Sequence, residues 1–389
     1  MKKHLLITAM LITDISFASQ FVANIPKSDR YISGTPEFVE PDFQNPTFKF
    51  VDGSNASFYG IDNSGNLWVI GRNSEGQLGL GHNNKVTVWT KTSFTDVIDV
   101  SGGGLFAILL DSSGNVWSTG ENTEGQLALG NKENTNIWTK TSLSNIRDIE
   151  AGYYSSYAID NTNKVWSVGV SSSLGNGIVG DRTTWQNSGL GNVDSMSAGA
   201  YSAVAIKKNA EIYVTGKNTK GSLGIGTNVD QFDWVKSPLE EVKRLSIGSH
   251  WNNIVLTKDR KIWVTGNNDK GQLGVGNTVD RNTWTEIAFP NPYKLVGGYR
   301  FNYILDTEGN VWTTGENSSG QLGLGDNINR SSWVKTNIKD IRLISASSHA
   351  GLAIDKNGKI FVTGANSGGV LGVGNIGSVN TWTEQITKP

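Results

Sequence analysis

The sequence predicts an all-β fold, a closed seven-bladed β-propeller of four-stranded blades with a repeat period of about 49 residues. Two observations predict it. First, a short apolar segment that contains Trp, Tyr or Phe and ends in Gly recurs seven times at nearly constant spacing. Second, the 389 residues include 47 Gly, 13 Trp and only 8 Pro, a composition typical of many short strands joined by tight turns.

The recurring segments define the repeat. They are Leu67–Gly71, Val116–Gly120, Val165–Gly169, Ile212–Gly216, Ile262–Gly266, Val311–Gly315 and Ile360–Gly364, so their final glycines lie 47 to 50 residues apart. Each unit also has a second tryptophan near its end, at Trp89, Trp138, Trp185, Trp234, Trp284, Trp333 and Trp382. A tryptophan at one place in every unit is what packing between blades requires.

Each unit has room for four strands. In the second unit, residues 107–110 and 116–120 are β-rich and flank a turn of Asp, Ser, Gly and Asn, which predicts a hairpin. A strand over 97–101 and one around Trp138 complete the set. A solenoid is the alternative repeat architecture, but solenoids need distinct capping units. The seventh unit resembles the others, which favours a closed ring.

The first 47 residues lie outside the repeat. Residues 1–19 combine a positive start, a short apolar run and small residues at Ala18 and Ser19, which predicts a signal peptide. Asp14 favours the alternative, an ordinary N-terminal segment that stays on the protein. Residues 20–47 contain four prolines and are expected to form an extended arm. The propeller is expected to occupy 48–389.

A glycine-rich string lies between the two tryptophans of most units. In the first unit it is Gly-Arg-Asn-Ser-Glu-Gly-Gln-Leu-Gly-Leu-Gly, residues 71–81. It recurs at 120–130, 266–276 and 315–325, and in looser form at 216–226 and 364–374. The string resembles the GxNxxGQLGxG core of the regulator-of-chromosome-condensation repeat family, over about residues 48–389. This resemblance implies a seven-bladed propeller.

Two departures limit what the resemblance implies about function. The third unit, residues 169–177, lacks the Asn and Gln of the string. Family members often place a His after the first strand of the blade. The residues at that place in this sequence are Ser57, Phe106, Ser155, Ser202, Asn252, Phe301 and Ala350. Eukaryotic members resemble exchange factors that use an inserted wedge, and units of 47 to 50 residues leave no room for one. We therefore expect a bacterial or viral type rather than the nuclear exchange factor.

The repeated polar residues favour structural roles. The glycines are expected at turn positions with positive φ, and the Asn and Gln of the string are expected to bond the loop backbone. Aspartate closes the second strand in five units, while Lys207 and Lys258 are assigned to that place in two, which favours turn formation over acid–base chemistry. There is no Cys, no nucleophile elbow and no histidine pair at metal-ligand spacing. We expect no enzyme activity, no cofactor and no metal.

Side chains that differ between units are the candidates for recognition. The loop after the first strand carries aromatic and basic residues in successive units, and equivalent loops emerge on one rim of a propeller. The predicted partner-binding residues are Tyr153, Tyr154, Tyr201, His250, Trp251, Tyr299, Arg300 and His349. Trp, Tyr and Arg dominate the energetics of protein interfaces. The alternative is that these side chains fill the central channel or pack locally.

The resulting hypothesis is a non-enzymatic propeller, secreted or periplasmic, that binds a protein partner through an aromatic rim. Net charge is −1, with no basic stripe, so nucleic acid is not expected as a partner, and no segment is long enough to cross a membrane. Three alternatives stay open. They are a structural virion or cell-surface assembly component docked through residues 20–47, a GTPase-directed effector or exchange factor, and a glycan-binding propeller.

Overall fold

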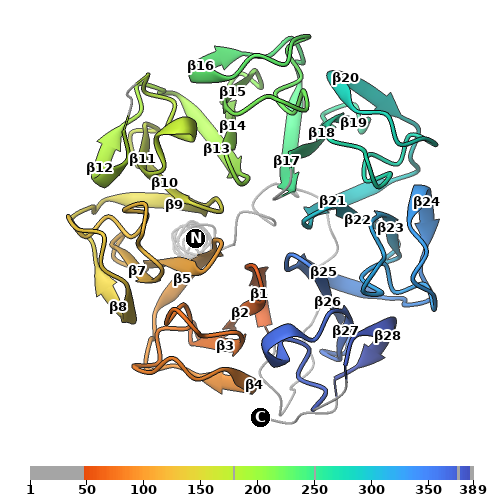
Figure 1. The fold of residues 1–389 in the computed structure, drawn as a ribbon, viewed down its shortest axis with the longest axis horizontal. Coiled ribbons are helices and arrows are strands. Elements are labelled where there is room, and N and C mark those ends of the chain that lie inside the picture. Colours follow the sequence, from red (N-terminus) through yellow and green to blue (C-terminus); the bar gives the residue numbers. More distant parts are fainter. Residues whose placement is uncertain (1–47, 178–179, 249–250, 375–376, 386–389) are drawn as a thin grey trace, which may run out of the picture. The chain divides into compact units, whose positions relative to one another are not determined.

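Seven four-stranded antiparallel sheets make up the protein in the computed structural model, which describes residues 48–177, 180–248, 251–374 and 377–385. The sheets are arranged radially, and the first strand of each lies nearest the centre (Figure 1). The predicted all-β, seven-bladed architecture is confirmed. The predicted signal peptide (1–19) and the predicted arm (20–47) lie outside the described residues and stay predictions.

Each blade is one continuous stretch of chain, with its strands hydrogen-bonded in sequence order. The first three blades comprise β1 (Phe48–Gly53), β2 (Ser57–Asp62), β3 (Leu67–Gly71), β4 (Val86–Lys91), β5 (Val97–Gly102), β6 (Phe106–Asp111), β7 (Val116–Gly120), β8 (Thr135–Lys140), β9 (Ile146–Ala151), β10 (Ser155–Asp160), β11 (Val165–Gly169) and β12 (Arg182–Asn187). The next two comprise β13 (Val193–Ala198), β14 (Ser202–Lys207), β15 (Ile212–Gly216), β16 (Gln231–Lys236), β17 (Val242–Gly248), β18 (Asn252–Thr257), β19 (Ile262–Gly266) and β20 (Arg281–Ile287). The last two comprise β21 (Pro292–Gly297), β22 (Phe301–Asp306), β23 (Val311–Gly315), β24 (Arg330–Lys335), β25 (Ile341–Ala346), β26 (Ala350–Asp355), β27 (Ile360–Gly364) and β28 (Val379–Glu384). Two short 3₁₀ turns, η2 (Ser171–Ser173) and η3 (Ser367–Gly369), replace the standard loop in the third and seventh blades.

The second strand of each blade is buried on both faces. In β6, the sequence FAILLD is buried at its first five positions, because a sheet packs against each side of the blade. A strand that is covered on both faces is a continuous apolar run rather than an alternating one. The apolar cores therefore lie between neighbouring blades: one of them joins Tyr59, Leu67 and Leu78 of the first blade to Leu109 and Trp138 of the second.

The second tryptophan of a blade packs against the glycine-rich loop of the preceding blade. A Cβ added to Gly79, whose φ is +65°, would lie 2.3 Å from Trp138 Nε1. Gly224 and Trp284 stand in the same relation at the boundary between the fourth and fifth blades, at 2.5 Å. The predicted role of these tryptophans in packing between blades is confirmed.

The Asn and Gln of the string hold the loop between the third and fourth strands. Asn73 Oδ1 accepts a hydrogen bond from the Leu78 N–H (2.9 Å), and Gln77 Oε1 accepts one from the Glu75 N–H (3.0 Å). The second, fifth and sixth blades repeat both bonds, through Asn122, Gln126, Asn268, Gln272, Asn317 and Gln321. The loop polar groups are therefore structural, as predicted.

The turn aspartates are structural too. Asp62 accepts hydrogen bonds from the Ser64 and Asn66 N–H groups and from Trp68 Nε1, at 2.9 Å each. Burial alone would raise the pKa of Asp62, but these bonds outweigh it and hold the pKa below its ordinary value. One assignment was wrong: in the fifth blade the corresponding residue is Thr257, not Lys258, because Thr257 ends β18 and lies nine residues before Gly266, as Asp62 lies nine before Gly71.

The ring closes by packing rather than by a shared strand in the part of the chain that is described. Phe48 and Trp89 of the first blade share one apolar core with Leu352 and Val362 of the last. Trp89 Nε1 donates a hydrogen bond to Gln385 Oε1 (2.9 Å) across the same boundary. We call this boundary between the first and seventh blades the seam.

Candidate binding site on one rim

The turns between the first and second strands are held in the same way in every blade. The N–H that follows the glycine at the end of the third strand donates to the carbonyl of the turn. Lys217 N–H bonds Tyr201 O, and Asn267 N–H bonds Trp251 O, both at 2.8 Å. A Cβ on Gly216 would lie 2.1 Å from Tyr201 O, so only glycine allows this approach. Equivalent turns therefore emerge on one face of the ring.

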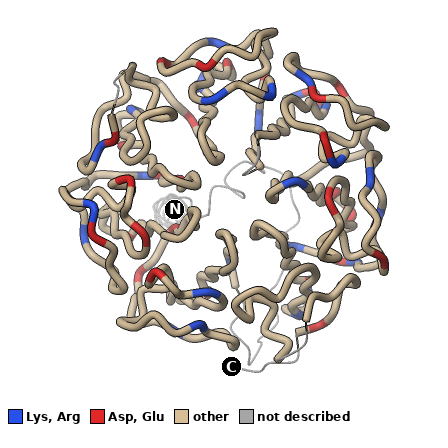
Figure 2. The backbone as a smooth tube through the Cα atoms, in the orientation of Figure 1, with Lys and Arg blue, Asp and Glu red and all other residues tan. Residues whose placement is uncertain are grey.

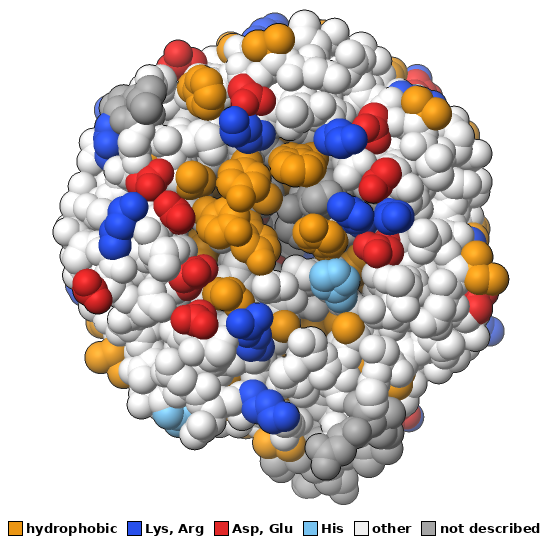
Figure 3. All heavy atoms as spheres, viewed as in Figure 1, with side chains coloured by type: hydrophobic (Ala, Val, Ile, Leu, Met, Phe, Trp, Pro, Cys, Tyr) orange, Lys and Arg blue, Asp and Glu red, His pale blue; other side chains and the backbone are white. Residues whose placement is uncertain are grey.

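Four of the predicted side chains form one continuous group, which we call the aromatic rim: Tyr153, Tyr154, Tyr201 and Trp251. Successive ring centroids are 4.6, 5.3 and 6.4 Å apart. They span the third, fourth and fifth blades, and a hydrophobic group lies beside the centre of this face (Figure 3). Burial and the neighbouring Tyr201 raise the pKa of Tyr154, so its hydroxyl stays neutral at physiological pH.

A second group lies across the centre. Tyr299 and His349 have ring centroids 5.2 Å apart, and the Arg300 guanidinium lies 5.3 Å from the Tyr299 ring. Arg300 also forms an ion pair with Asp269 at 3.5 Å. Burial, helped by the Arg300 charge and opposed by Glu316, lowers the pKa of His349, so the imidazole is neutral at pH 7. The predicted site residue His250 lies outside the described residues.

All seven described site residues are partly exposed. They pack on one another, as the alternative proposed, and they also present aromatic surface to solvent. Trp251 has a φ of +56°, an uncommon backbone conformation for a bulky residue. Strained residues cluster at functional sites, where surrounding structure holds them.

Sequence reasoning missed the contribution of the first blade. Asn55, at the turn between β1 and β2, donates through Nδ2 to the Tyr153 hydroxyl at 3.0 Å. It also missed the residues after each third-strand glycine, such as Arg72 and Glu121, which lie beside these turns. Their position one residue after the recurring glycine could have identified them, because that N–H anchors the turn.

Acidic side chains flank the aromatic rim on one side. Partial burial and the neighbouring Glu75 raise the pKa of Glu121, and the Glu121 charge in turn raises the pKa of Tyr153, after burial. Across the ring as a whole, both signs of charge are spread over the blades (Figure 2). The described residues include no group of three His, Cys, Asp or Glu placed to hold a metal ion. They also include no helix with the length and apolarity to span a bilayer.

Comparisons with known proteins agree with this architecture. Two models of the regulator of chromosome condensation (RCC1) repeat match the sequence, one at residues 64–110, 113–159 and 308–348, the other at 97–126 and 294–321. No curated protein matches the sequence.

Solved structures share the fold at low identity. The structure of Prp20p from Saccharomyces cerevisiae, studied with its binding to Gsp1p and histones, is 19% identical, with a TM-score of 0.75 over 82% of this chain and 85% of that chain. The structure of yeast RCC1 (Prp20) bound to Kap60 is 17% identical, with a TM-score of 0.76 over 92% of this chain and 90% of that chain. The structure of human WBSCR16 is 17% identical, with a TM-score of 0.73 over 83% of this chain and 95% of that chain. The chain therefore contains repeats of the regulator of chromosome condensation (RCC1) type at the matched residues, and it shares the fold of these solved structures.

Proposed function

We propose that this chain is a non-enzymatic binding propeller whose aromatic rim engages a protein partner. The observation that supports it best is the continuous, partly exposed contact of Tyr153, Tyr154, Tyr201 and Trp251 across three blades. These rings are already packed on one another, so binding orders few side chains and loses little conformational entropy.

A protein partner fits the surface better than nucleic acid. The aromatic rim is flanked by Glu75 and Glu121, which would repel a phosphate backbone. Prp20p binds Gsp1p and histones, and yeast RCC1 binds Kap60. These relatives support a binding role for such a ring, and at 17 to 19% identity they carry no particular partner over to this chain.

We also propose that the protein acts outside the cytoplasm, in a secreted or periplasmic form. This rests on the signal-like composition of residues 1–19 alone. Intact mass and N-terminal sequencing of the natural protein test it: loss of about the first 19 residues is expected. A full-length chain would favour the structural alternative, in which residues 20–47 dock onto a neighbouring subunit.

The binding role is tested by affinity capture with three baits: wild type, a rim variant (Tyr154→Ala, Tyr201→Ala, Trp251→Ala) and a matched control. The control removes three apolar side chains from outermost strands, Val88→Ala, Ile137→Ala and Phe232→Ala, whose exposed fractions are 43, 56 and 47%. A partner held by wild type and the control but not by the rim variant is expected. A partner retained by all three would contradict the proposal.

A further inference from the structure

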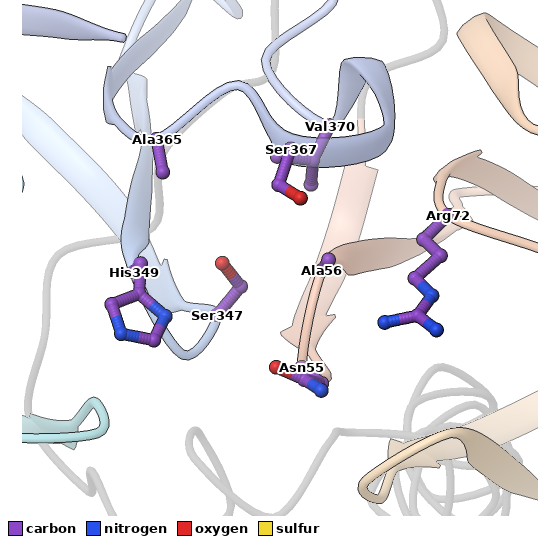
Figure 4. Close-up of a pocket in the computed structure, with 8 residues that line it drawn as sticks. All are labelled: Asn55, Ala56, Arg72, Ser347, His349, Ala365, Ser367 and Val370. Atoms are coloured by element: carbon purple, nitrogen blue, oxygen red, sulfur yellow. The ribbon is translucent and has the colours of Figure 1, made fainter. Parts of the chain in front are cut away.

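A small pocket lies at the seam, on the same face as the aromatic rim. Its volume is about 90 Å³. Asn55, Ala56 and Arg72 of the first blade line one wall (Figure 4). The other wall comes from the seventh blade: Ser347, His349, Ala365, Ser367 and Val370. A volume of this size suits a small functional group rather than a whole ligand.

The pocket exists because small residues break the repeat at the seam. Where the second blade has Glu121 and Gln126, the seventh has Ala365 and Val370. Gln126 is fully buried in its own loop, whereas the shorter Val370 at the equivalent place lines the pocket. The walls are fixed relative to each other by backbone bonding across the seam, such as the Ser348 N–H to Ser54 O at 3.2 Å.

The lining is rich in hydrogen-bond donors and contains no carboxylate. Arg72 and His349 lie on opposite sides of it (Figure 4). The Arg72 Nε–H donates to Ser74 Oγ at 2.8 Å, which orients the guanidinium. The ion pairs found among the described residues do not include Arg72, and the carboxyl that its charge is seen to act on is Glu121, whose pKa it lowers against the effect of burial.

We propose that the seam pocket binds a carboxylate of the protein partner, with Arg72 as the charged donor and Asn55, Ser367 and His349 as neutral donors. This rests on the proposed function, because the partner supplies the carboxylate. A planar guanidinium pairs with a carboxylate through two parallel hydrogen bonds, a geometry that few other groups match. Asn55 bonds Tyr153, so a partner on the aromatic rim has its acidic group within reach of the pocket.

The test needs no partner. The full chain, with labelled histidine and arginine, is titrated with acetate at pH 7 and constant ionic strength, and NMR follows the His349 ring and the Arg72 Nε–H. Saturable shifts are expected with acetate and not with acetamide, its neutral isostere. Arg72→Gln should abolish saturation, whereas Arg182→Gln, which removes an arginine of the outer strand β12 that does not line the pocket, should preserve it.

Two further probes identify the source of the carboxylate. N-acetyl-aspartate α-amide carries only a side-chain carboxylate and N-acetylglycine only a terminal one, and the one that saturates at lower concentration names the source. Shifts that grow linearly, that chloride reproduces, or that persist in Arg72→Gln would overturn the proposal. That failure would leave the capture result of the rim variant unchanged, so the two proposals fail separately. Equal melting temperatures of the variants confirm that they are folded.

Discussion

Two glycines of one loop provide a matched test of how neighbouring blades hold each other. Gly224 and Gly226 have φ values of +64° and +81°, so alanine at either position takes a left-handed conformation that costs about 1–2 kcal/mol. At Gly226 the added Cβ would meet nothing within 4 Å. At Gly224 it would lie 2.5 Å from Trp284 Nε1, which bonds Ser237 Oγ at 2.8 Å.

The indole at that boundary has little room to move, because it packs between the fourth and fifth blades. Displacing a packed side chain costs roughly 1–3 kcal/mol. We therefore expect Gly226→Ala to lower the free energy of unfolding by about 1–2 kcal/mol, and Gly224→Ala by roughly 2–5 kcal/mol. Urea unfolding followed by circular dichroism measures both. Equal losses would refute the account of packing between blades.

Three further predictions concern charge and closure. Burial, with Glu150 and Asp99 nearby, raises the pKa of Asp52 to about 7 in the folded protein. The free energy of unfolding should therefore fall by on the order of 2–4 kcal/mol between pH 4 and 7. Asp52→Asn should flatten that decline in urea titrations. The pKa of Asp111 is lowered in the folded protein, so the stabilisation that its carboxylate provides is present above about pH 4 and lost on acidification. Asp111→Ala should lower the free energy of unfolding by roughly 1–3 kcal/mol at pH 7. A smaller difference between the variant and wild type at pH 3 checks the sign. Gln385→Ala leaves the buried Trp89 N–H without its acceptor and should lower stability by about 1–2 kcal/mol, and an unchanged melting curve would show that the seam does not need this bond.

Most of the fold could be predicted because the repeat is local in sequence. The strand Val116–Gly120 has the bounds that the sequence predicts, since an aromatic residue and a final glycine mark this strand in every blade. A closed ring was predicted, but how it closes could not be, because that depends on packing between Phe48 and residues some 300 positions later. The assignment of Lys258 was one residue too far along the chain, since β18 ends at Thr257.

The site was only partly predictable for a related reason. That Tyr154, Tyr201 and Trp251 share one face follows from their place in the repeat. That their rings touch depends on the radius of the ring and on side-chain direction, which a sequence does not encode locally. The role of Asn55 was missed because its partner, Tyr153, lies two blades away.

The most direct test of the central claim is the dissociation constant of the captured partner for wild type, the rim variant and the outer-strand control, by isothermal titration calorimetry. Removing three interface aromatics, at 1 kcal/mol or more each, predicts a loss of affinity of about 100-fold or more for the rim variant. The control should bind as wild type does. An affinity that is unchanged in the rim variant would contradict the claim that this surface binds the partner.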